Sequence, residues 1–196
     1  MAHTIFDTPV VNLLLSRVSR LILRLVGWRL VGELPAEPKY MLIVAPHTSN
    51  WDFVIGLLIV FAYRIRLTWM GKHTIFVFPF GIVMRWLGGV PIDRRVSSNL
   101  VDATAQMFRH AQRLTVAMAP EGTRKRVDRW RSGFYWMAHQ GQVPIVLGYI
   151  DYARKQAGVG PLFWPSGDYQ QDMLQVQSFY QDKTARYPEQ FNSRIV

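Results

Sequence analysis

Residues 40–62 read YMLIVAPHTSNWDFVIGLLIVFA, and this stretch decides the fold of the chain. The continuous apolar run at residues 40–45 predicts a strand that is buried on both faces. Residues 53–62 form an apolar helical pattern, and the polar residues at positions 48–50 are of types favoured at a helix N-cap. A buried strand, a short polar loop and an apolar helix in this order are typical of an α/β domain.

The polar loop contains His47, and Asp52 follows it at the expected start of the helix. Residues five apart on a straight helix differ by about 140° in direction, so the two side chains can meet only if His47 lies on the loop and Asp52 in the first helical turn. That arrangement would pair a general base with the carboxylate that orients it. Alternatively, Ser49 and Asp52 form a capping box that closes the helix start, and His47 is an ordinary loop histidine. This stretch alone leaves both interpretations open.

The length and composition of the chain limit the classes of protein to consider. Its 196 residues, of which 49% are hydrophobic and 18% charged, predict one domain with a sizeable core and argue against disorder. The absence of cysteine excludes disulfides, thiolate catalysis and Cys-ligated metals. A net charge of +10 indicates an anionic partner, which is nucleic acid, an anionic membrane surface or an acidic protein.

The segment at residues 10–30 is apolar but contains Arg17, Arg20, Arg24 and Arg29. The first three arginines are spaced three and four apart, which puts them on one face of a helix, with Leu and Val on the other. A membrane-spanning helix would have to bury these arginines at a cost of a few kcal/mol each. We therefore predict a basic amphipathic helix that lies on a membrane surface, rather than one that packs only on the protein's own core.

Strand and helix patterns alternate through the rest of the chain. The alternation predicts an α/β domain with a mixed, mostly parallel sheet flanked by helices. We expect strands at residues 67–71, 90–92, 114–118 and 143–150, an edge strand at 161–164, and helices at 51–63, 79–87, 99–112, 133–140 and 168–183. The polar tail that ends at residue 196 is expected to be loose.

Three polar clusters follow predicted strands, at residues 47–52, 93–95 and 121–124. Clusters at the carboxyl ends of the strands in an open α/β sheet tend to converge on one site. Together they offer a base with its orienting carboxylate, arginines, and a glycine whose backbone can approach an anion closely. Such a set suits acyl transfer to a hydroxyl group beside a phosphate.

Other kinds of site have little support in the sequence. His3, His73, His110 and His139 lack ligand-like spacing, so we expect no metal site. Ser132 is not part of a G-x-S-x-G elbow, which argues against a serine hydrolase. Nucleic-acid binding is not expected, because the arginines cluster after strands and on the N-terminal helix rather than alternating with aromatic residues.

The sequence HTSNWD at residues 47–52 resembles the His-x4-Asp motif of the glycerol-phosphate and lysophosphatidic acid acyltransferase family. GVPIDR at residues 89–94, PEGTR at 120–124 and VPI at 143–145 are similar to the second, third and fourth motifs of that family, in the same order. The resemblance covers residues 33–150.

One smaller feature adds to the resemblance, and another departs from the family pattern. Gly71 and Lys72, placed before the PFG sequence at residues 79–81, also resemble the family pattern between the first two motifs. Pro46 stands where the family often has Asn, and Lys125 where it often has Ser. The reaction class follows from the motifs, whereas the acyl acceptor does not.

The resemblance also implies roles for individual residues. His47 would take the proton from the acceptor hydroxyl, and Asp52 would hold the imidazole tautomer and stabilise the imidazolium. Lys72 would be a further contact to the phosphate. The residues that would shape the glycerol-phosphate site are Arg94, Glu121, Gly122, Thr123 and Arg124.

We therefore expect an O-acyltransferase that moves a fatty acyl group from an acyl-CoA or acyl carrier protein thioester to a lysophospholipid-type acceptor, with 1-acylglycerol-3-phosphate as the expected one. No cofactor beyond the thioester co-substrate is expected. Residues 1–32 would associate with the cytoplasmic face of an anionic membrane as a peripheral or monotopic segment, and residues 33–196 would form the catalytic domain. The alternatives are an acyltransferase for a non-phosphate lyso-lipid, such as a lyso-aminolipid, and a non-catalytic basic module that binds membranes or nucleic acid.

Overall fold

The computed structural model describes residues 4–92 and 97–195. The strands are β1 (Arg29–Val31), β2 (Lys39–Ala45), β3 (Leu67–Lys72), β4 (Gly89–Ile92), β5 (Leu114–Met118), β6 (Ile145–Asp151) and β7 (Gln156–Phe163). The α-helices are α1 (Pro9–Leu25), α2 (Asn50–Tyr63), α3 (Phe80–Trp86), α4 (Ser97–His110), α5 (Gly133–Gly141) and α6 (Tyr169–Tyr180), and three short 3-10 helices are η1 (Ile5–Asp7), η2 (His73–Phe76) and η3 (Pro188–Gln190).

The strands of the described residues form one seven-stranded sheet in the order β1-β7-β6-β2-β5-β3-β4. The pairs that β2, β3, β4, β5 and β6 make with one another are all parallel. Only β7 runs antiparallel to its neighbour β6, and β1 is parallel to β7. This confirms the predicted mixed, mostly parallel sheet, and it places the carboxyl ends of five strands along one edge.

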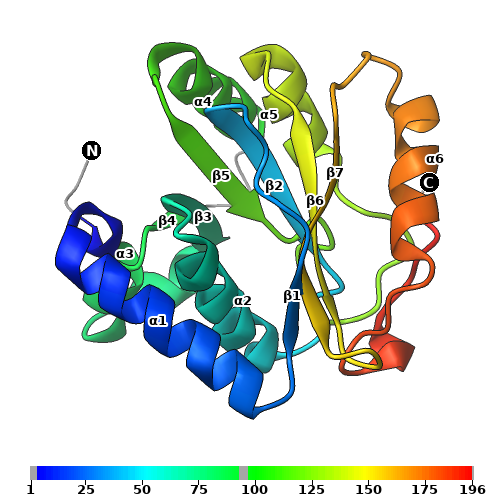
Figure 1. The fold of residues 1–196 in the computed structure, drawn as a ribbon. Helices are drawn as coiled ribbons and strands as arrows, with labels where there is room; N and C mark the ends of the chain where they lie inside the picture. The colour runs from blue at the N-terminus through cyan, green and yellow to red at the C-terminus, as the bar shows by residue number, and fades with distance from the viewer. Residues whose placement is uncertain (1–3, 93–96, 196) are drawn as a thin grey trace.

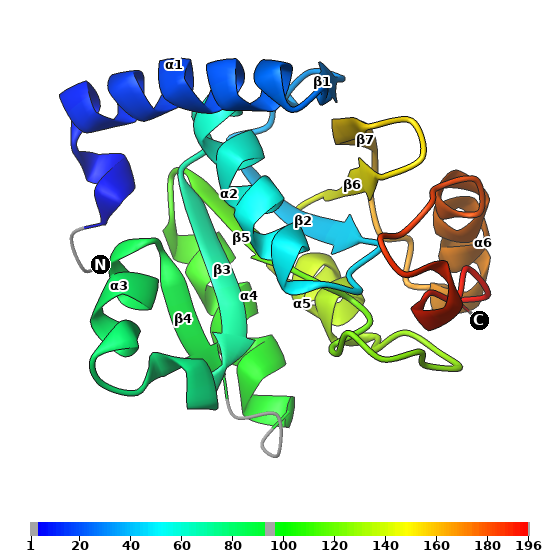
Figure 2. The ribbon, with the colours of Figure 1, turned by 90° about the horizontal axis from the view of Figure 1, so that it is seen from below.

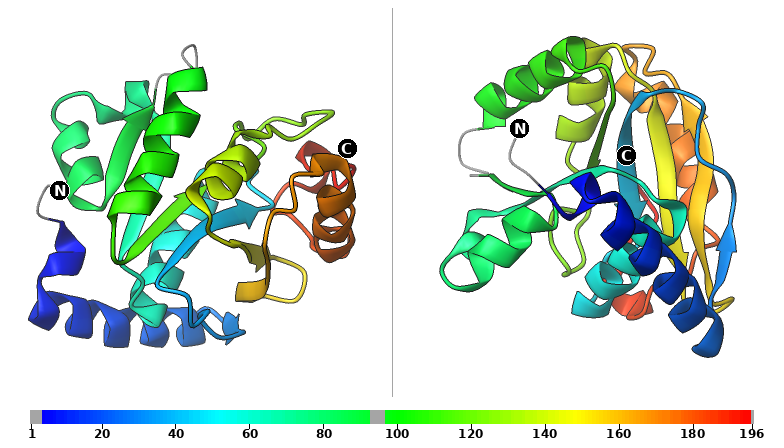
Figure 3. Two further views of the ribbon diagram at one scale, coloured as in Figure 1. Left: turned by 90° about the horizontal axis from the view of Figure 1, so that it is seen from above. Right: turned by 60° about the vertical axis from the view of Figure 1, so that its left-hand side comes forward.

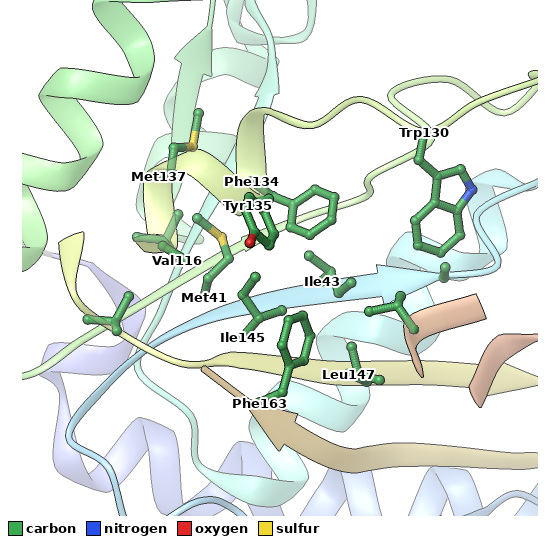
Figure 4. Close-up of a cluster of buried hydrophobic side chains, with 14 of the residues drawn as sticks. Met41, Ile43, Val116, Trp130, Phe134, Tyr135, Met137, Ile145, Leu147 and Phe163 are labelled. Atoms are coloured by element: carbon green, nitrogen blue, oxygen red, sulfur yellow. The ribbon is translucent and has the colours of Figure 1, made fainter. Parts of the chain in front are cut away.

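Helices cover both faces of the sheet, as the buried strand patterns require. Met41 and Ile43 of β2 point to the face covered by α4, α5 and α6, while Tyr40 and Leu42 point to the face covered by α2. Figure 1 shows α1, α2 and α3 on one side of the sheet and α4, α5 and α6 on the other, and the right-hand view in Figure 3 shows the same two layers. Figure 4 shows the larger core, where side chains of β2, β5 and β6 meet those of α5.

The N-terminal helix is shorter than the predicted segment at residues 10–30. It ends at Leu25 because Gly27, with a φ of +80°, turns the chain, and the Trp28 N–H donates to the Leu23 carbonyl at 2.8 Å. Trp28 is buried, and β1 follows at once. The last part of the predicted helix is therefore a strand of the sheet.

β1 also changes the place of the predicted edge strand at residues 161–164. The observed strand, β7, begins earlier, at Gln156, and β1 covers its outer side through pairs such as Arg29 with Gln156. The prediction of an edge strand was wrong because β1, which is only three residues long, is too short to show a strand period in the sequence.

The C-terminal tail is not loose, contrary to our expectation. Ile195 is only 1% exposed and belongs to the main core, against which Phe191 also packs. The Ile195 N–H donates to Gln177 Oε1 of α6 at 2.9 Å, and the Tyr187 N–H donates to Thr48 Oγ1 at 3.2 Å. A few apolar residues in a polar segment are enough to hold this tail against the domain, beside the loop that carries His47.

The inner face of α1 packs on the domain. Ser16, Ser19 and Leu23 are buried, and small serines allow α1 to approach α2 closely. The guanidinium of Arg20 donates two hydrogen bonds, at 3.0 and 2.8 Å, to the carbonyl of Ala62 at the end of α2. One of the arginines of the expected polar face therefore forms hydrogen bonds within the protein.

The outer face of α1 is apolar and exposed. Leu14, Val18, Leu21 and Leu25 have exposed fractions of 56%, 49%, 56% and 77%. These residues follow one another at helical spacing on the side opposite the buried stripe. The helix thus packs on the domain and still leaves an apolar stripe in solvent. No helix within residues 4–92 and 97–195 is long and apolar enough to cross a membrane.

Candidate active site

The site forms where the loops after β2 and β5 meet. These strands are parallel neighbours, with Ile43 paired to Met118, so both loops leave the sheet at the same edge (Figure 2). The backbone N–H of His47 donates to Glu121 Oε1 at 2.9 Å, which joins the first predicted polar cluster to the third. The predicted convergence of these two clusters is therefore present in the structure.

His47 and Asp52 have the arrangement that the sequence suggested. His47 lies on the loop and Asp52 in the first turn of α2, and His47 Nδ1 lies 3.5 Å from Asp52 Oδ2. The His47 side chain is 23% exposed and that of Asp52 only 2%. A buried carboxylate thus faces one ring nitrogen of a histidine that a substrate can reach from outside.

The capping interpretation also holds, and the same carboxylate serves both purposes. Asp52 Oδ2 accepts hydrogen bonds from the N–H groups of Thr48 and Ser49, each at 2.7 Å, and the Ser49 hydroxyl oxygen accepts one from the Trp51 N–H. These bonds complete a capping box at the start of α2. The two interpretations do not exclude each other, because Oδ2 fixes the loop backbone while it faces the imidazole.

Tyr152 completes the surroundings of Asp52, and sequence reasoning missed it. Its hydroxyl donates to Asp52 Oδ1 at 2.6 Å, from a position directly after β6, the other neighbour of β2 in the sheet. Trp28 packs edge-on against the Tyr152 ring, and the Arg186 guanidinium lies 5.8 Å from its centroid. The only signal in the sequence was its place at the carboxyl end of the strand predicted at residues 143–150.

The hydrogen-bond donors around Asp52 determine whether its carboxyl group is ionised. Burial by itself raises the pKa of a carboxyl group, but His47, the Tyr152 hydroxyl and the Ser49 N–H together hold the pKa of Asp52 below its ordinary value. Burial and the hydrogen bond to Asp52 raise the pKa of Tyr152 well above its ordinary value, so the phenol remains a donor. Asp52 is therefore ionised at neutral pH.

Glu121 is buried with far fewer donors. Oε1 accepts the His47 N–H, whereas Oε2 has no hydrogen-bond partner among the residues that the structure describes. Burial raises the pKa of Glu121 to about 8; the charge of Asp52 adds to this rise, and the His47 N–H opposes it. The carboxyl group is therefore mainly protonated at neutral pH.

Three of the other predicted phosphate-site residues follow Glu121 on the same loop. Gly122 has a φ of +69°, a conformation that favours glycine, and its N–H donates to the Ala119 carbonyl at 3.1 Å. Thr123 and Arg124 follow on the same loop and are exposed. The turn therefore presents a hydroxyl group and a guanidinium to solvent next to the loop that carries His47.

Lys72 lies farther along the same edge. It is exposed at the carboxyl end of β3, which is the neighbour of β5 on the side away from β2. Arg94 lies outside the described residues, so the structure does not place it. Within the part of the chain that the structure describes, no group of three or more His, Asp or Glu side chains could hold a metal ion.

Comparisons with known proteins identify a matching family model and a solved structure with a similar fold. A family model described as Acyltransferase matches residues 31–150 of the chain, which include the loops after β2 and β5 and strand β6. Among solved structures, the crystal structure of PlsC, the 1-acyl-sn-glycerophosphate (LPA) acyltransferase from Thermotoga maritima, has a similar fold, with a TM-score of 0.58 and 15% sequence identity. The match covers 85% of this chain and 74% of that one. A search of curated proteins finds no match.

Proposed function

The chain belongs to the acyltransferase family, and on this premise we propose that it transfers a fatty acyl group from a thioester to the hydroxyl group of a lysophospholipid, with 1-acylglycerol-3-phosphate as the acceptor. The observation that carries the proposal is the 3.5 Å approach of His47 Nδ1 to the buried Asp52, beside a loop that presents Arg124. The similarity in fold to the LPA acyltransferase PlsC supports the choice of acceptor.

His47 acts as the general base in this proposal. Nδ1 faces Asp52, so Nε2 is the nitrogen that takes the proton from the acceptor hydroxyl. The hydroxyl oxygen attacks the thioester carbonyl, and the tetrahedral intermediate then expels the thiolate. The imidazolium returns the proton to the thiolate, so an ester and a free thiol leave the enzyme. No acyl-enzyme is needed, since the acceptor itself is the nucleophile.

Asp52 and Tyr152 prepare the imidazole for this step. The ionised carboxylate favours the tautomer that keeps the proton on Nδ1, and it stabilises the imidazolium that forms. The hydroxyl of Tyr152 holds the second carboxylate oxygen, and the capping bonds hold the first, which restricts rotation of the carboxylate plane. Tyr152 is thus a positioning residue.

The loop after β5 receives the acceptor headgroup. Arg124 can bind a phosphate bidentately, Lys72 adds charge from the end of β3, and Gly122 leaves room for a close approach of the headgroup. Glu121 is buried behind this surface and holds the backbone of His47, so it supports the site rather than ligating the phosphate.

The thioester co-substrate supplies the acyl group in this mechanism, and no other cofactor takes part in it. Both acyl-CoA and an acyl carrier protein are anionic. The exposed basic residues after the Arg124 turn would attract either of them, and they are Lys125, Arg126, Arg129 and Arg131.

The outer face of α1 supports a peripheral or monotopic place on the cytoplasmic face of an anionic membrane. Its exposed stripe of Leu14, Val18, Leu21 and Leu25 would enter the lipid interface, and Arg17 and Arg24, both exposed, would meet anionic headgroups. In this proposal residues 1–32 carry the membrane contact and residues 33–196 the chemistry, although β1 of the first segment is a strand of the sheet.

The experiment that tests the function follows thiol release by the purified protein. Acyl-CoA and an acyl carrier protein thioester are each tested with 1-acylglycerol-3-phosphate, a zwitterionic lysophospholipid and a lyso-aminolipid. We expect ester formation with 1-acylglycerol-3-phosphate and its loss in the His47→Ala variant. Turnover with the lyso-aminolipid alone would contradict the proposed phosphate site, and no turnover with any pair would contradict the enzymatic role.

A further inference from the structure

A second exposed apolar surface lies on α3 and the turn before it, separate from the outer face of α1. Val77, Phe78, Phe80 and Ile82 have exposed fractions of 61%, 84%, 70% and 65%. Large aromatic and branched side chains are rarely exposed together on a soluble surface without a partner. The residues of this surface, which we call the α3 patch, are Val77, Phe78, Phe80, Ile82, Val83 and Trp86.

The α3 patch is held outward by a rigid base. Phe76 is buried and packs on Trp69 of β3, with ring centroids 5.5 Å apart. Gly81 lies so close to it that a Cβ there would be 2.1 Å from the Phe76 carbonyl oxygen, so the turn is compact. The Gly81 N–H donates to the Val77 carbonyl at 2.7 Å. Phe78 and Phe80 therefore cannot fold back into the core without breaking this turn.

The charged residues nearest the α3 patch in the sequence are basic. No acidic residue occurs in the sequence between Asp52 and Asp93. Lys72 and Arg85 are exposed close to the patch in sequence, and the Arg85 guanidinium lies 5.3 Å from the Phe76 ring centroid. An apolar centre with a basic border is complementary to the surface of an anionic bilayer, where the rings enter the interface and the cations meet headgroups.

The position of α3 relates it to the membrane helix proposed above. Figures 1 and 2 place α3 on the same side of the molecule as the first turns of α1, with η1 leading into α1. A Cβ on Gly88, just after α3, would lie 3.0 Å from Phe6 of η1, and Arg66 pairs with Asp7 of η1. The start of α1 and the end of α3 are therefore neighbours in the structure.

We propose that the α3 patch is a second insertion point in an anionic bilayer, separate from the outer face of α1. This inference rests on the proposed membrane-surface function and adds to it an orientation, because two contacts restrict rotation about the axis of α1. The patch is also joined to the catalytic loop. Phe53, next to Asp52, packs edge-on against Trp69 at 4.9 Å between centroids, and Trp69 packs on Phe76.

The test compares vesicle binding of the wild-type protein with that of a Phe78→Ser/Phe80→Ser double variant, by sedimentation with phosphatidylglycerol-rich vesicles. Burial of two phenyl rings predicts that the variant binds at least about tenfold more weakly. A matched control is Leu174→Ser on α6, a half-exposed apolar residue far from both α1 and α3 in the sequence, which should bind as the wild type does. Equal binding by the wild type and the double variant would overturn the proposal.

A second measurement reports insertion directly. Brominated lipids should quench more of the tryptophan emission of the wild type than of Trp86→Phe, because Trp86 lies at the end of α3 and is 46% exposed. Equal fractional quenching in the two proteins would place α3 outside the bilayer. Thermal melts of the double variant exclude misfolding as the cause of weaker binding.

Two further measurements, of turnover and of oligomeric state, distinguish this inference from its alternatives. The double variant should convert a short-chain acceptor, kept below its critical micelle concentration, at the same rate as the wild type. When the same type of acceptor is presented in vesicles, the rate of the double variant should be lower than that of the wild type. If no acceptor is turned over, the function fails while vesicle binding and quenching still decide the inference. A wild-type dimer that the double variant converts to monomers, with vesicle binding unchanged, would show that a second copy covers the patch and would overturn the proposal.

Discussion

Two buried carboxyl groups contact the loop of His47, and their surroundings differ. Asp52 and Glu121 are almost equally buried, at 4% and 5% exposed. Asp52 receives hydrogen bonds from two backbone N–H groups and the Tyr152 hydroxyl and faces an imidazole nitrogen, whereas Glu121 receives the His47 N–H and leaves one oxygen without a partner among the described residues. The stronger effect of burial on Glu121 and the larger number of donors around Asp52 together place the two pKa values on opposite sides of the ordinary value.

The difference assigns separate tasks to the two loops. The loop after β2 keeps a negative charge beside the base, which is what proton transfer requires. The loop after β5 keeps a neutral carboxyl group in the interior and exposes Thr123 and Arg124, which would meet the acceptor in the proposed function. Variants of the first loop should therefore act on kcat, and variants of the second on the acceptor KM or on stability.

The largest effect is expected for His47→Ala, which removes the base. We expect kcat to fall at least about a thousandfold, with the melting temperature nearly unchanged because the His47 backbone N–H still donates to Glu121. Thiol release at saturating acceptor checks this. Residual activity within about tenfold of the wild type would show that another group takes the proton.

Asp52→Asn should come next, with kcat lowered by about a hundredfold to a thousandfold. The Asn oxygen can still accept the N–H groups of Thr48 and Ser49, so the start of α2 and the thermal stability should be kept. Asp52→Ala is the comparison, since it removes the capping bonds as well and should lower the melting temperature. Lost stability in the Asn variant with activity retained would restrict Asp52 to helix capping.

Glu121→Gln should change the pH dependence of stability. The pKa of Glu121 is raised in the folded protein, so its proton is retained there after the unfolded chain has lost it, and the wild type loses stability as the pH rises from its ordinary pKa through about 8. The Gln variant has no such loss, and its stability relative to the wild type should rise by up to a few kcal/mol between pH 5 and pH 9. Denaturant unfolding at both pH values measures this. A constant difference would mean that Glu121 is ionised in the folded state.

Arg124→Ala tests the second loop as the acceptor site. We expect the acceptor KM to rise about tenfold or more and the donor KM to change little, because the guanidinium binds the phosphate. Lys125→Ala, at an exposed neighbouring position, serves as the control and should change the acceptor KM less. A larger rise in the donor KM would move the anionic donor to this loop.

Tyr152→Phe should have the smallest effect. Removal of the hydroxyl leaves Asp52 ionised but frees its Oδ1, so kcat should fall severalfold with the acceptor KM unchanged. The pKa of Asp52 loses one of the causes that lower it. The acid-induced loss of stability should therefore be smaller, and should end at a slightly higher pH, than in the wild type. A change in KM alone would show that Tyr152 contacts substrate instead.

Much of the site could be predicted because its signals are local. A buried strand, a run of N-cap residues and a carboxylate in the first turn of a helix identify the His47 loop from a short stretch of sequence. Strand alternation then places the 121–124 cluster at the same edge, and the family resemblance, which the Acyltransferase match confirms, gives the reaction class.

The features that were missed depend on contacts between distant parts of the chain. Tyr152 meets Asp52 across a hundred positions, and only the order of β6 beside β2 brings them together. β1 is a strand only because β7 pairs with it, and the polar tail is ordered only because Ile195 enters the core. The charge of Glu121 likewise follows from its burial and from the small number of donors around it, which a sequence does not display.

The helix α2 lies between the proposed membrane helix α1 and the proposed active site. Arg20 of α1 binds the carbonyl of Ala62 at one end, and Asp52 lies in the first turn at the other. Its 14 residues span about 21 Å at 1.5 Å per residue. With α1 as the only contact to the interface and α2 along the membrane normal, a lysolipid would rise by a distance comparable to one leaflet's share of the hydrocarbon core, about 15 Å, before its hydroxyl group met His47. Each turnover would then include partial extraction of the lipid, and a longer acyl chain on the acceptor would make that step slower.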